Sequence, residues 1–364
     1  MVPYIFNTIR RYDWIMISAA LFLVALGLLS LFSTAGGSYG ILGRQFIWVF
    51  LGIALMIGVS MVDYRVFRLY PQPVLLLYGI GVLALAALFF FGSTIRGTRG
   101  WIELGIVTIG PAEMIKPVLV ILLAKYFSMR HVEIYRFRHI ITSGVYVLLP
   151  ATLIFIQPEF GSVAVVLGIW FAIVLVAGIR IRHILVLVFM AILLGSLLWG
   201  TVLADYQKSR LITFLQPSAD PQGQGYNVIQ STIAVASGGF LGKGLGNGTQ
   251  VQQGFLPENK TDFIFAAIGE ELGFMGITAL LLALGVLLVR ITHVARIAGN
   301  NFAQFSALGF AAFILVQAFV NIGMNVGILP VTGIPLPFVS YGGSSMITLF
   351  VTLGFLQSIH LRSS

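Results

Sequence analysis

The charged residues that could do chemistry in this sequence gather in two short motifs beside long apolar runs. The first, LPENKTDFIFAAIGEELG, holds Asp262, Glu270 and Glu271, and a carboxylate of this kind can act as a general base. At 100° per residue Glu270 lies about 80° around a helix from Asp262, so we expect these two to share a cavity. Glu271 is roughly opposite, which predicts a structural contact with another helix. The alternative for Asp262 is a helix start, with Thr261 as N-cap.

The second motif, IGPAEMIKP, places Glu113 and Lys116 three residues apart on one helical face. Such a pair could simply neutralise itself, but a buried ion pair stabilises a fold weakly, which favours a place in a wet cavity. Just before it, IRGTRGWIELG supplies Arg96 and Arg99, and arginine suits phosphate recognition. Carboxylates beside cations indicate an anionic, lipid-linked substrate. Further candidate anion ligands in a later loop are Lys208, Arg210 and Lys243.

Apolar runs long enough to cross a membrane must position these motifs. Of the 364 residues, 58% are hydrophobic and only 9% are charged, which excludes a water-soluble fold. Because one crossing takes about 20 apolar residues, we predict an all-α polytopic membrane protein of about ten transmembrane helices, forming one domain over residues 1–364. The predicted spans are residues 14–34, 46–62, 73–91, 111–128, 140–157, 162–179, 183–203, 263–289, 303–327 and 342–360.

The distribution of Lys and Arg orients these spans. Most basic residues fall on one side, and the positive-inside rule then places both termini in the cytoplasm and residues 204–262 in a large extracytoplasmic loop between helices 7 and 8. Within it, GYNVIQSTIAVASGGFLGKG indicates a short amphipathic helix on the outer surface, followed by glycines that allow tight turns or a flexible flap. All five histidines fall at predicted inner ends. A base on the outer side must therefore be a carboxylate.

Composition removes several other classes of function. The formal charge of +9 is accounted for by the cytoplasmic loops, so no nucleic-acid partner is predicted. Cysteine is absent, which excludes a thiol nucleophile. Ser340 and Ser344 lack an evident activating base. They stand in GILPVTGIPLPFVSYGG, whose prolines exclude a regular lipid-facing helix and leave two alternatives: a segment that shapes a substrate groove, or a rigid turn.

The stretch NIGMNVGILPVTGIPLPFVSYGGSS, residues 321–345, resembles the signature of the SEDS family of shape, elongation, division and sporulation proteins. RGTRGWIELG, PAEMIKP, QPEFGS and FLPENKTDFIFA extend the resemblance over nearly the whole chain and favour the elongation members over the division members. It implies a peptidoglycan glycosyltransferase that polymerises lipid II on the outer face of the bacterial cytoplasmic membrane during cell elongation. It also implies a class B penicillin-binding protein and elongation-complex membrane proteins as partners.

The resemblance maps the family's essential aspartate onto Asp262 and its polar cavity residues onto Glu113 and Lys116. Asp262 would take the proton of an acceptor hydroxyl in one inverting displacement, and Lys116, with Arg210 or a divalent cation, would stabilise the departing pyrophosphate. Lys243 and Glu270 complete the expected substrate-binding set. Oxygen ligands for Mg²⁺ or Mn²⁺ are present without a diagnostic spacing, so the metal stays open, and no nucleotide cofactor is expected.

Two other functions fit the composition. In a lipid II flippase or transporter, the same carboxylates and Lys116 would form a translocation or proton path. A non-catalytic scaffold would leave the intramembrane carboxylates unexplained. The candidate residues cluster toward the outer half of the spans rather than across their full depth, which favours catalysis over transport.

Overall fold

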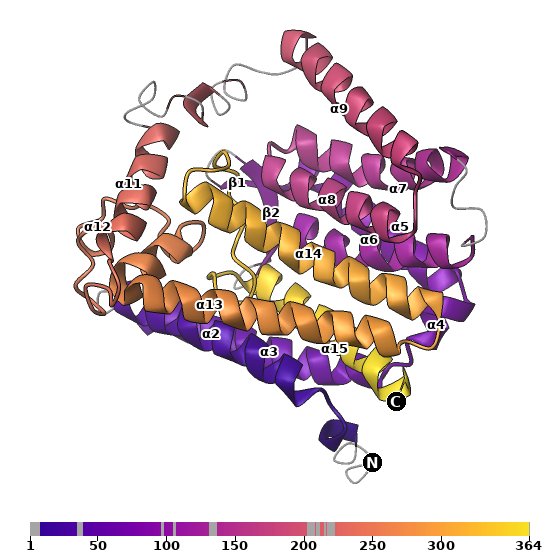
Figure 1. Cartoon of the computed structure of the whole chain (residues 1–364), viewed down its shortest axis with the longest axis horizontal. Helices are drawn as coiled ribbons and strands as arrows, with labels where there is room; N and C mark the ends of the chain where they lie inside the picture. Colours follow the sequence, from indigo (N-terminus) through magenta and orange to yellow (C-terminus); the bar gives the residue numbers. More distant parts are fainter. Residues whose placement is uncertain are drawn as a thin grey trace.

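A computed structural model of the chain describes residues 8–34, 39–95, 98–104, 107–130, 137–201, 208, 212–214, 216 and 223–363. Its long helices lie side by side as a bundle, with α9 leaning away from the others (Figure 1). The elements up to residue 128 are α2 (Trp14–Thr34), α3 (Tyr39–Met61), α4 (Arg65–Leu69), α5 (Gln72–Phe91), β1 (Ser93–Ile95), β2 (Thr98–Leu104), β3 (Val107–Ile109) and α6 (Pro111–Ser128).

The second half of the chain adds the helices that carry the predicted loop and its flanks. Among them, α11 occupies the stretch predicted to form an amphipathic helix, and it packs on α13 rather than lying alone on the surface. These elements are α7 (Phe137–Ile156), α8 (Phe160–Val176), α9 (Ile181–Thr201), α11 (Gln224–Ser237), α12 (Thr249–Gln252), α13 (Ile264–Ile297), α14 (Asn301–Asn325) and α15 (Gly343–Ser363).

Every predicted span overlaps a helix, and the all-α polytopic fold is confirmed. Within the described residues, seven helices are long and apolar enough to cross a membrane, namely α2, α3, α5, α7, α13, α14 and α15. The helix α8, with 17 residues, is shorter, and α6 carries three buried charged residues, Glu113, Lys116 and Lys125. The number of ten crossings therefore stays a prediction.

The core forms where α14 and α15 pack against several neighbours at once. The helix α15 lies along α3, while α14 contacts α6, α8 and α13. Glycine permits the closest approach between α2 and the chain before α15: a Cβ on Gly27 would lie 2.1 Å from the Val339 carbonyl oxygen. Such contacts fix the ends of the helices relative to one another.

A small antiparallel sheet joins α5 to α6, where the sequence predicted only an outer loop. Its strand order is β1-β2-β3, with Ser93 opposite Trp101 and Ile102 opposite Ile109. The β-branched residues in this stretch, among them Thr98, Ile102 and Val107, favour extended backbone. The sheet brings Trp101 against Gly110, directly before α6.

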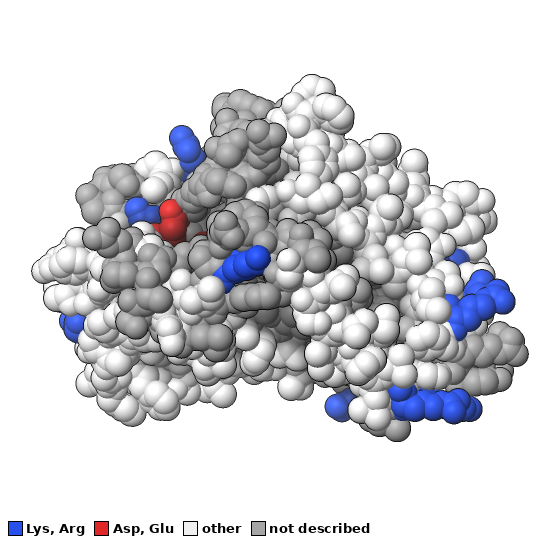
Figure 2. All heavy atoms as spheres, turned by 90° about the horizontal axis from the view of Figure 1, so that it is seen from above, with Lys and Arg blue, Asp and Glu red and all other residues white. Residues whose placement is uncertain are grey.

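The two ends of the bundle differ in their elements and charge. The helices α11 and α12 lie at one end, and α4 and the C-terminus lie toward the other (Figure 1). Basic side chains are visible at both ends, whereas the acidic atoms visible from above lie at the end that carries α11 and α12 (Figure 2). Basic residues of α4 and of the last turns of α6 and α15 lie together at the α4 end, as the positive-inside orientation predicts; they are Arg65, Arg68, Lys125 and Arg362.

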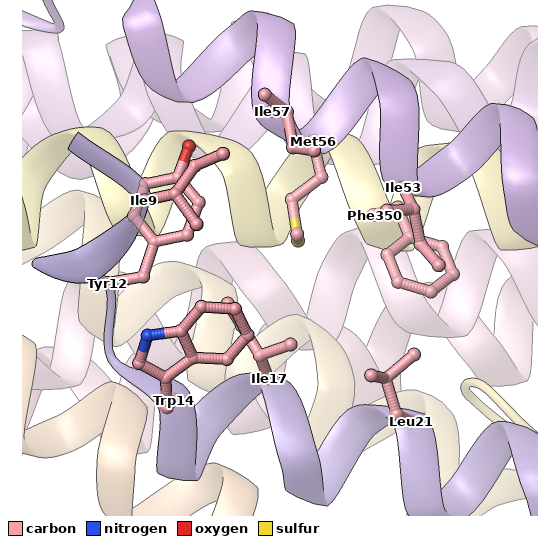
Figure 3. Close-up of a pocket in the computed structure, with 9 residues that line it drawn as sticks. All are labelled: Ile9, Tyr12, Trp14, Ile17, Leu21, Ile53, Met56, Ile57 and Phe350. Atoms are coloured by element: carbon pink, nitrogen blue, oxygen red, sulfur yellow. The ribbon is translucent and has the colours of Figure 1, made fainter. Parts of the chain in front are cut away.

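An apolar cavity of about 120 Å³ lies near the α4 end, between α2, α3 and α15. Its lining side chains are drawn in Figure 3. They carry no charge, and the hydroxyl of Tyr12 is hydrogen-bonded to Ser60. The cavity therefore belongs to the packing of the helices. The lining residues are Ile9, Tyr12, Trp14, Ile17, Leu21, Ile53, Met56, Ile57 and Phe350.

Candidate functional site

Asp262 lies in a turn directly before α13. The helix begins at Ile264, and Phe263 in the N-cap position supplies no side-chain cap. Thr261 donates its hydroxyl to Glu258 Oε2 at 3.1 Å. The alternative in which Thr261 caps the helix is therefore wrong, because the turn continues two residues further before helical geometry begins.

The chain between α14 and α15, residues 326–342 and called here the C-terminal segment, holds this turn by its backbone. The N–H of Tyr341 donates to the Lys260 carbonyl at 2.9 Å. The hydroxyl of Ser340 donates to the Thr261 carbonyl at 2.6 Å and accepts from the Leu336 N–H at 2.8 Å. Ser340 is thus fully engaged in positioning backbone, which agrees with its exclusion as a nucleophile.

Two amides at the end of α14 hold Asp262 itself. The Nδ2 atoms of Asn321 and Asn325 donate to the Asp262 carbonyl at 3.0 Å and 2.9 Å. Asn321 also donates to the Ile334 carbonyl at 2.7 Å. Neither asparagine was a predicted site residue, because an uncharged amide within a span gives no signal beyond helix packing.

The Glu113–Lys116 pair lies in the first two turns of α6, which starts with Pro111 after an N-cap glycine. Lys116 Nζ lies 2.5 Å from Glu113 Oε1, and the two residues are 0% and 6% exposed. The other carboxylate oxygen of Glu113 has no hydrogen-bond partner among the described residues. The predicted ion pair is therefore present, and it leaves one buried acceptor.

Glu159 joins this pair and was not a predicted site residue. It occupies the turn between α7 and α8, and a Cβ on Gly100 of β2 would lie 1.5 Å from its Oε1. Burial raises the pKa of Glu159 to about 7, an effect that Lys116 opposes and Glu113 reinforces. The signal that could have found it is its place among the outer carboxylates, in the motif QPEFGS.

The C-terminal segment connects the turn of Asp262 with the start of α8. A Cβ on Gly333 would lie 3.6 Å from Asp262 Oδ2, and Gly333 has a φ of +72°, which favours glycine. A Cβ on Gly161 would meet the Ile334 side chain at 2.3 Å. The proline-rich segment is non-helical, as predicted, and it lies beside the candidate base.

Four helix starts meet around these groups, those of α6, α8, α13 and α15. Ser344, in the first turn of α15, accepts from the Gly110 N–H at 2.9 Å and donates to the Thr108 carbonyl at 2.9 Å. The N-terminal end of a helix carries a partial positive charge. This end of the bundle therefore suits an anionic group, with Lys116 as the buried full charge.

Glu270 does not share a cavity with Asp262, which corrects the prediction. Asp262 precedes the helix, so the helical projection that paired the two residues does not apply to it. Glu270 is 0% exposed and faces the returning chain, where Lys243 Nζ lies 2.7 Å from its Oε1. Its other donors are Thr249, Gln250 and Val251. Lys243 and Glu270 are thus paired with each other.

Glu271 makes the predicted structural contact with another helix. Its Oε1 accepts from the hydroxyl of Ser33 of α2 at 2.5 Å and from Gln252 Nε2 at 3.1 Å. The glycine loop, residues 238–254, is therefore held by tight turns and two buried carboxylates, which favours the first of the two alternatives given for its glycines.

Several predicted anion ligands cannot be placed. Arg96 and Arg210 lie outside the described residues, and for Arg99 only the backbone on β2 is described. Lys208 is half-buried. Among the described residues, no group of three or more His, Asp or Glu side chains could hold a metal ion, and Asp205 and Asp220 fall outside that part of the chain. A bound Mg²⁺ or Mn²⁺ stays a hypothesis.

Comparisons with known proteins find relatives that match nearly the whole chain. Residues 9–364 match the FtsW/RodA/SpoVE family, described as cell cycle proteins. The chain is 36% identical over 348 residues to the peptidoglycan glycosyltransferase MrdB of Escherichia coli K12, covering 96% of this chain and 93% of the relative. It is 35% identical to the stage V sporulation protein E of Bacillus subtilis, with 95% and 96% covered.

Solved structures show the same likeness. A structure described as a peptidoglycan synthase complex that coordinates polymerization and crosslinking matches with a TM-score of 0.83 at 33% identity, covering 97% of this chain and 98% of that one. The rod shape determining protein RodA of Thermus thermophilus matches with a TM-score of 0.70 at 30% identity, over 96% of each chain.

Proposed function

The chain belongs to the FtsW/RodA/SpoVE family of cell cycle proteins, and we propose that it is a peptidoglycan glycosyltransferase that polymerises lipid II, with Asp262 as the base. The observation that carries this proposal is the position of Asp262. Its carboxylate lies at the end of the bundle where α13 begins, next to Gly333. Its backbone is held by the C-terminal segment and by α14. A base held in this way loses little freedom when the acceptor binds.

The reaction needs one proton transfer and one bond exchange at carbon. The acceptor sugar hydroxyl attacks the anomeric carbon of the donor, a new carbon–oxygen bond forms, and the bond from that carbon to the pyrophosphate oxygen breaks. Asp262 takes the hydroxyl proton. Polyprenyl pyrophosphate leaves with the bonding electron pair. Because pyrophosphate is a good leaving group, one carboxylate suffices, in contrast to the two that glycoside hydrolysis uses.

Residues at the start of α6 would stabilise the negative charge of the leaving group. Lys116 would compensate the negative charge that develops on the pyrophosphate, helped by the converging helix N-termini. Glu113 would orient Lys116 within its buried site through their direct contact. Lys243 and Glu270, given their mutual contact, would act on the substrate indirectly by holding the glycine loop.

An apolar groove provides a place for the hydrocarbon chain of the donor. It has a volume of about 320 Å³ between α3, α5, α6 and α15, and only apolar side chains and Thr348 line it. Met114 and Pro117 belong to its lining, and they flank Glu113 and Lys116 along α6. A lipid in this groove would bring its pyrophosphate close to the buried lysine.

The basic residues grouped at the α4 end support an orientation with both termini in the cytoplasm and the site on the outer side of the bacterial cytoplasmic membrane. A class B penicillin-binding protein and other elongation-complex membrane proteins would be its partners. The complex named among the similar structures, which couples polymerization with crosslinking, supports a transpeptidase partner.

The test is polymer formation from purified lipid II in detergent. The wild type and Asp262→Asn would be compared, each alone and with a class B penicillin-binding protein, and each with Mg²⁺, with Mn²⁺ and with a chelator. Glycan strands from the wild type but not from Asp262→Asn would support the proposal. The comparison of Mg²⁺, Mn²⁺ and chelator would decide whether a metal ion is needed. Equal strands from the folded variant would overturn the role of Asp262. No strands under any condition would favour a lipid II flippase, to be measured as translocation in vesicles.

A further inference from the structure

Asn325, the last residue of α14, connects three separate parts of the outer end of the bundle. Its Nδ2 donates to the Asp262 carbonyl at 2.9 Å, and its own carbonyl accepts from the hydroxyl of Ser231 in α11 at 2.7 Å. Its Oδ1 accepts from the Ala266 N–H at 3.1 Å. Asn325 is 0% exposed, so water does not compete for these contacts.

The contact with Ala266 replaces a missing helix cap. The first N–H groups of a helix have no intrahelical partner and are normally satisfied by the side chain at the N-cap position. Phe263 occupies that position in α13 and has no group that could accept. Asn325 therefore caps α13 from another helix, through its amide oxygen, while its amide nitrogen holds the carbonyl of Asp262.

We infer that Asn325 is a positioning residue for Asp262: one amide fixes both the start of α13 and the peptide plane that precedes it, and so sets the direction in which the Asp262 carboxylate points. This inference rests on the proposed role of Asp262 as base. Asn321 assists, because its Nδ2 donates to the same carbonyl at 3.0 Å and joins it to the C-terminal segment through Ile334. Two donors on one carbonyl restrict the rotation of the peptide far more than one would.

The two functions of the amide can be separated by substitution. Asn325→Asp keeps an oxygen that accepts from Ala266, and a carboxylate is favourable at a helix N-terminus. It loses the N–H that donates to Asp262. Asn325→Ala loses both contacts. A merely structural role predicts that activity follows stability in the two variants, whereas positioning predicts low activity in both.

The chain offers a matched control in Asn300, at the other end of α14. Asn300 Oδ1 accepts from the Ala303 N–H at 3.0 Å, and its Nδ2 donates to the Tyr64 hydroxyl at 3.0 Å. Asn300→Asp therefore makes the same chemical change, with a retained cap and a lost donor, far along the helix from the site. It should leave polymerisation unchanged.

The experiment measures lipid II polymerisation kinetics and thermal unfolding of the full-length protein in detergent for wild type, Asn325→Asp, Asn325→Ala, Asn300→Asp and Asp262→Asn. We expect Asn325→Asp to lower the kcat of the folded molecules by roughly 10²-fold, as for a misplacement of about 1 Å, with KM close to that of the wild type. The melting temperature should fall as well, because the new carboxylate oxygen is buried against the carbonyls of Asp262 and Asn321. If Asn325→Asp fails to fold, the kcat of the Asn325→Ala molecules that still bind lipid II decides the matter.

The outcomes separate this inference from the proposed function. An active Asp262→Asn would overturn the role of Asp262 as base, and the positioning of that base with it. An inactive Asp262→Asn beside a fully active Asn325→Asp or Asn325→Ala would overturn the positioning role alone. A loss of kcat in Asn300→Asp equal to that in Asn325→Asp would show a general effect of replacing an asparagine of α14 with a carboxylate, and it would also overturn the positioning role.

Discussion

Lys243 contacts Glu270 through both its backbone and its side chain. The Lys243 N–H donates to the Glu270 carbonyl at 3.0 Å, and Lys243 Nζ lies 2.7 Å from Glu270 Oε1. In a regular helix the Glu270 carbonyl would accept from the N–H of residue 274 instead. A kink at Gly273 removes that bond, and the glycine loop takes its place. The loop is thus part of the structure of α13.

Backbone groups on both sides of the kink form hydrogen bonds with the glycine loop. The carbonyls of Glu270 and Glu271 accept from Lys243 and Gly244, and the N–H groups of Phe274 and Met275 donate to the carbonyls of Gly239 and Phe240. Four backbone groups released by the kink therefore all find partners. Because unsatisfied backbone groups are costly, loop and kink stabilise each other.

Replacing Lys243 with methionine should loosen this loop. The variant leaves the buried carboxylate of Glu270 without its charged donor, which costs roughly 1–3 kcal/mol of unfolding free energy. We expect faster amide exchange in residues 238–254 and a lower melting temperature, measured by hydrogen exchange and thermal unfolding. Lys208→Met, outside the glycine loop but within the same predicted extracytoplasmic stretch, is the control. Unchanged exchange in Lys243→Met would show that the backbone contacts alone hold the loop.

Replacing Gly273 with alanine should be strongly destabilising. Gly273 has φ +64° and ψ −159°, a region open essentially to glycine alone. A Cβ there would also lie 2.2 Å from the backbone nitrogen of Gly242. Strain of roughly 1–3 kcal/mol is expected in addition to the clash, seen as low folded yield or a lower melting temperature. Gly285→Ala, in the same helix with open space around it, should be tolerated. Equal behaviour of the two variants would contradict the kink.

The helices could be predicted from the sequence because membrane spans impose one strong pattern, apolar residues over a fixed length. Element ends were less predictable. The helix α13 was expected to end at residue 289 but continues to Ile297, since α-helical hydrogen bonding does not depend on an apolar environment. The β1–β3 sheet was missed because its strands are short and carry no clear alternation.

Some residues of the candidate site could be predicted from the sequence and others could not. Asp262, Glu113 and Lys116 could be found because charge in an apolar sequence is conspicuous. Asn321 and Asn325 could not, since their partner at Asp262 lies about 60 residues away in sequence and nothing local indicates the contact. Glu270 was misplaced because a helical projection was extended across a helix start that the sequence does not mark.

Glu159 should make folding stability depend on pH. Its folded pKa of about 7 lies above the ordinary value of 4.5, so the folded state holds the proton more tightly than the unfolded state does. The stabilisation is fully present below pH 4.5 and is lost as the pH rises through about 7. Thermal unfolding of the detergent-solubilised protein between pH 4.5 and 8 measures this loss. Glu159→Gln, which cannot titrate, should flatten that part of the curve, and an identical slope in both proteins would contradict the assignment.

Filling the apolar groove should weaken binding of a long polyprenyl donor. Ile121→Trp introduces bulk into the lining next to Val118 and Pro117. We expect KM for full-length lipid II to rise roughly tenfold, with a smaller change for an analogue whose lipid chain is short. Leu83→Trp, on the largely exposed face of α5, is the control. If both donors respond equally to Ile121→Trp, the groove does not hold the lipid chain.

The Glu113–Lys116 pair allows structure and chemistry to be separated by a double substitution. Removing one partner leaves a buried charge without compensation, so Glu113→Gln and Lys116→Met should each cost about 3–5 kcal/mol of stability. The double variant removes both charges, and its melting temperature should recover toward the wild-type value, because a buried ion pair stabilises a fold little more than apolar packing does. If Lys116 stabilises the leaving pyrophosphate, the stable double variant stays inactive in lipid II polymerisation while it still binds lipid II. A double variant that is both stable and fully active would show that the pair serves only the fold and would assign the leaving-group charge to another cation.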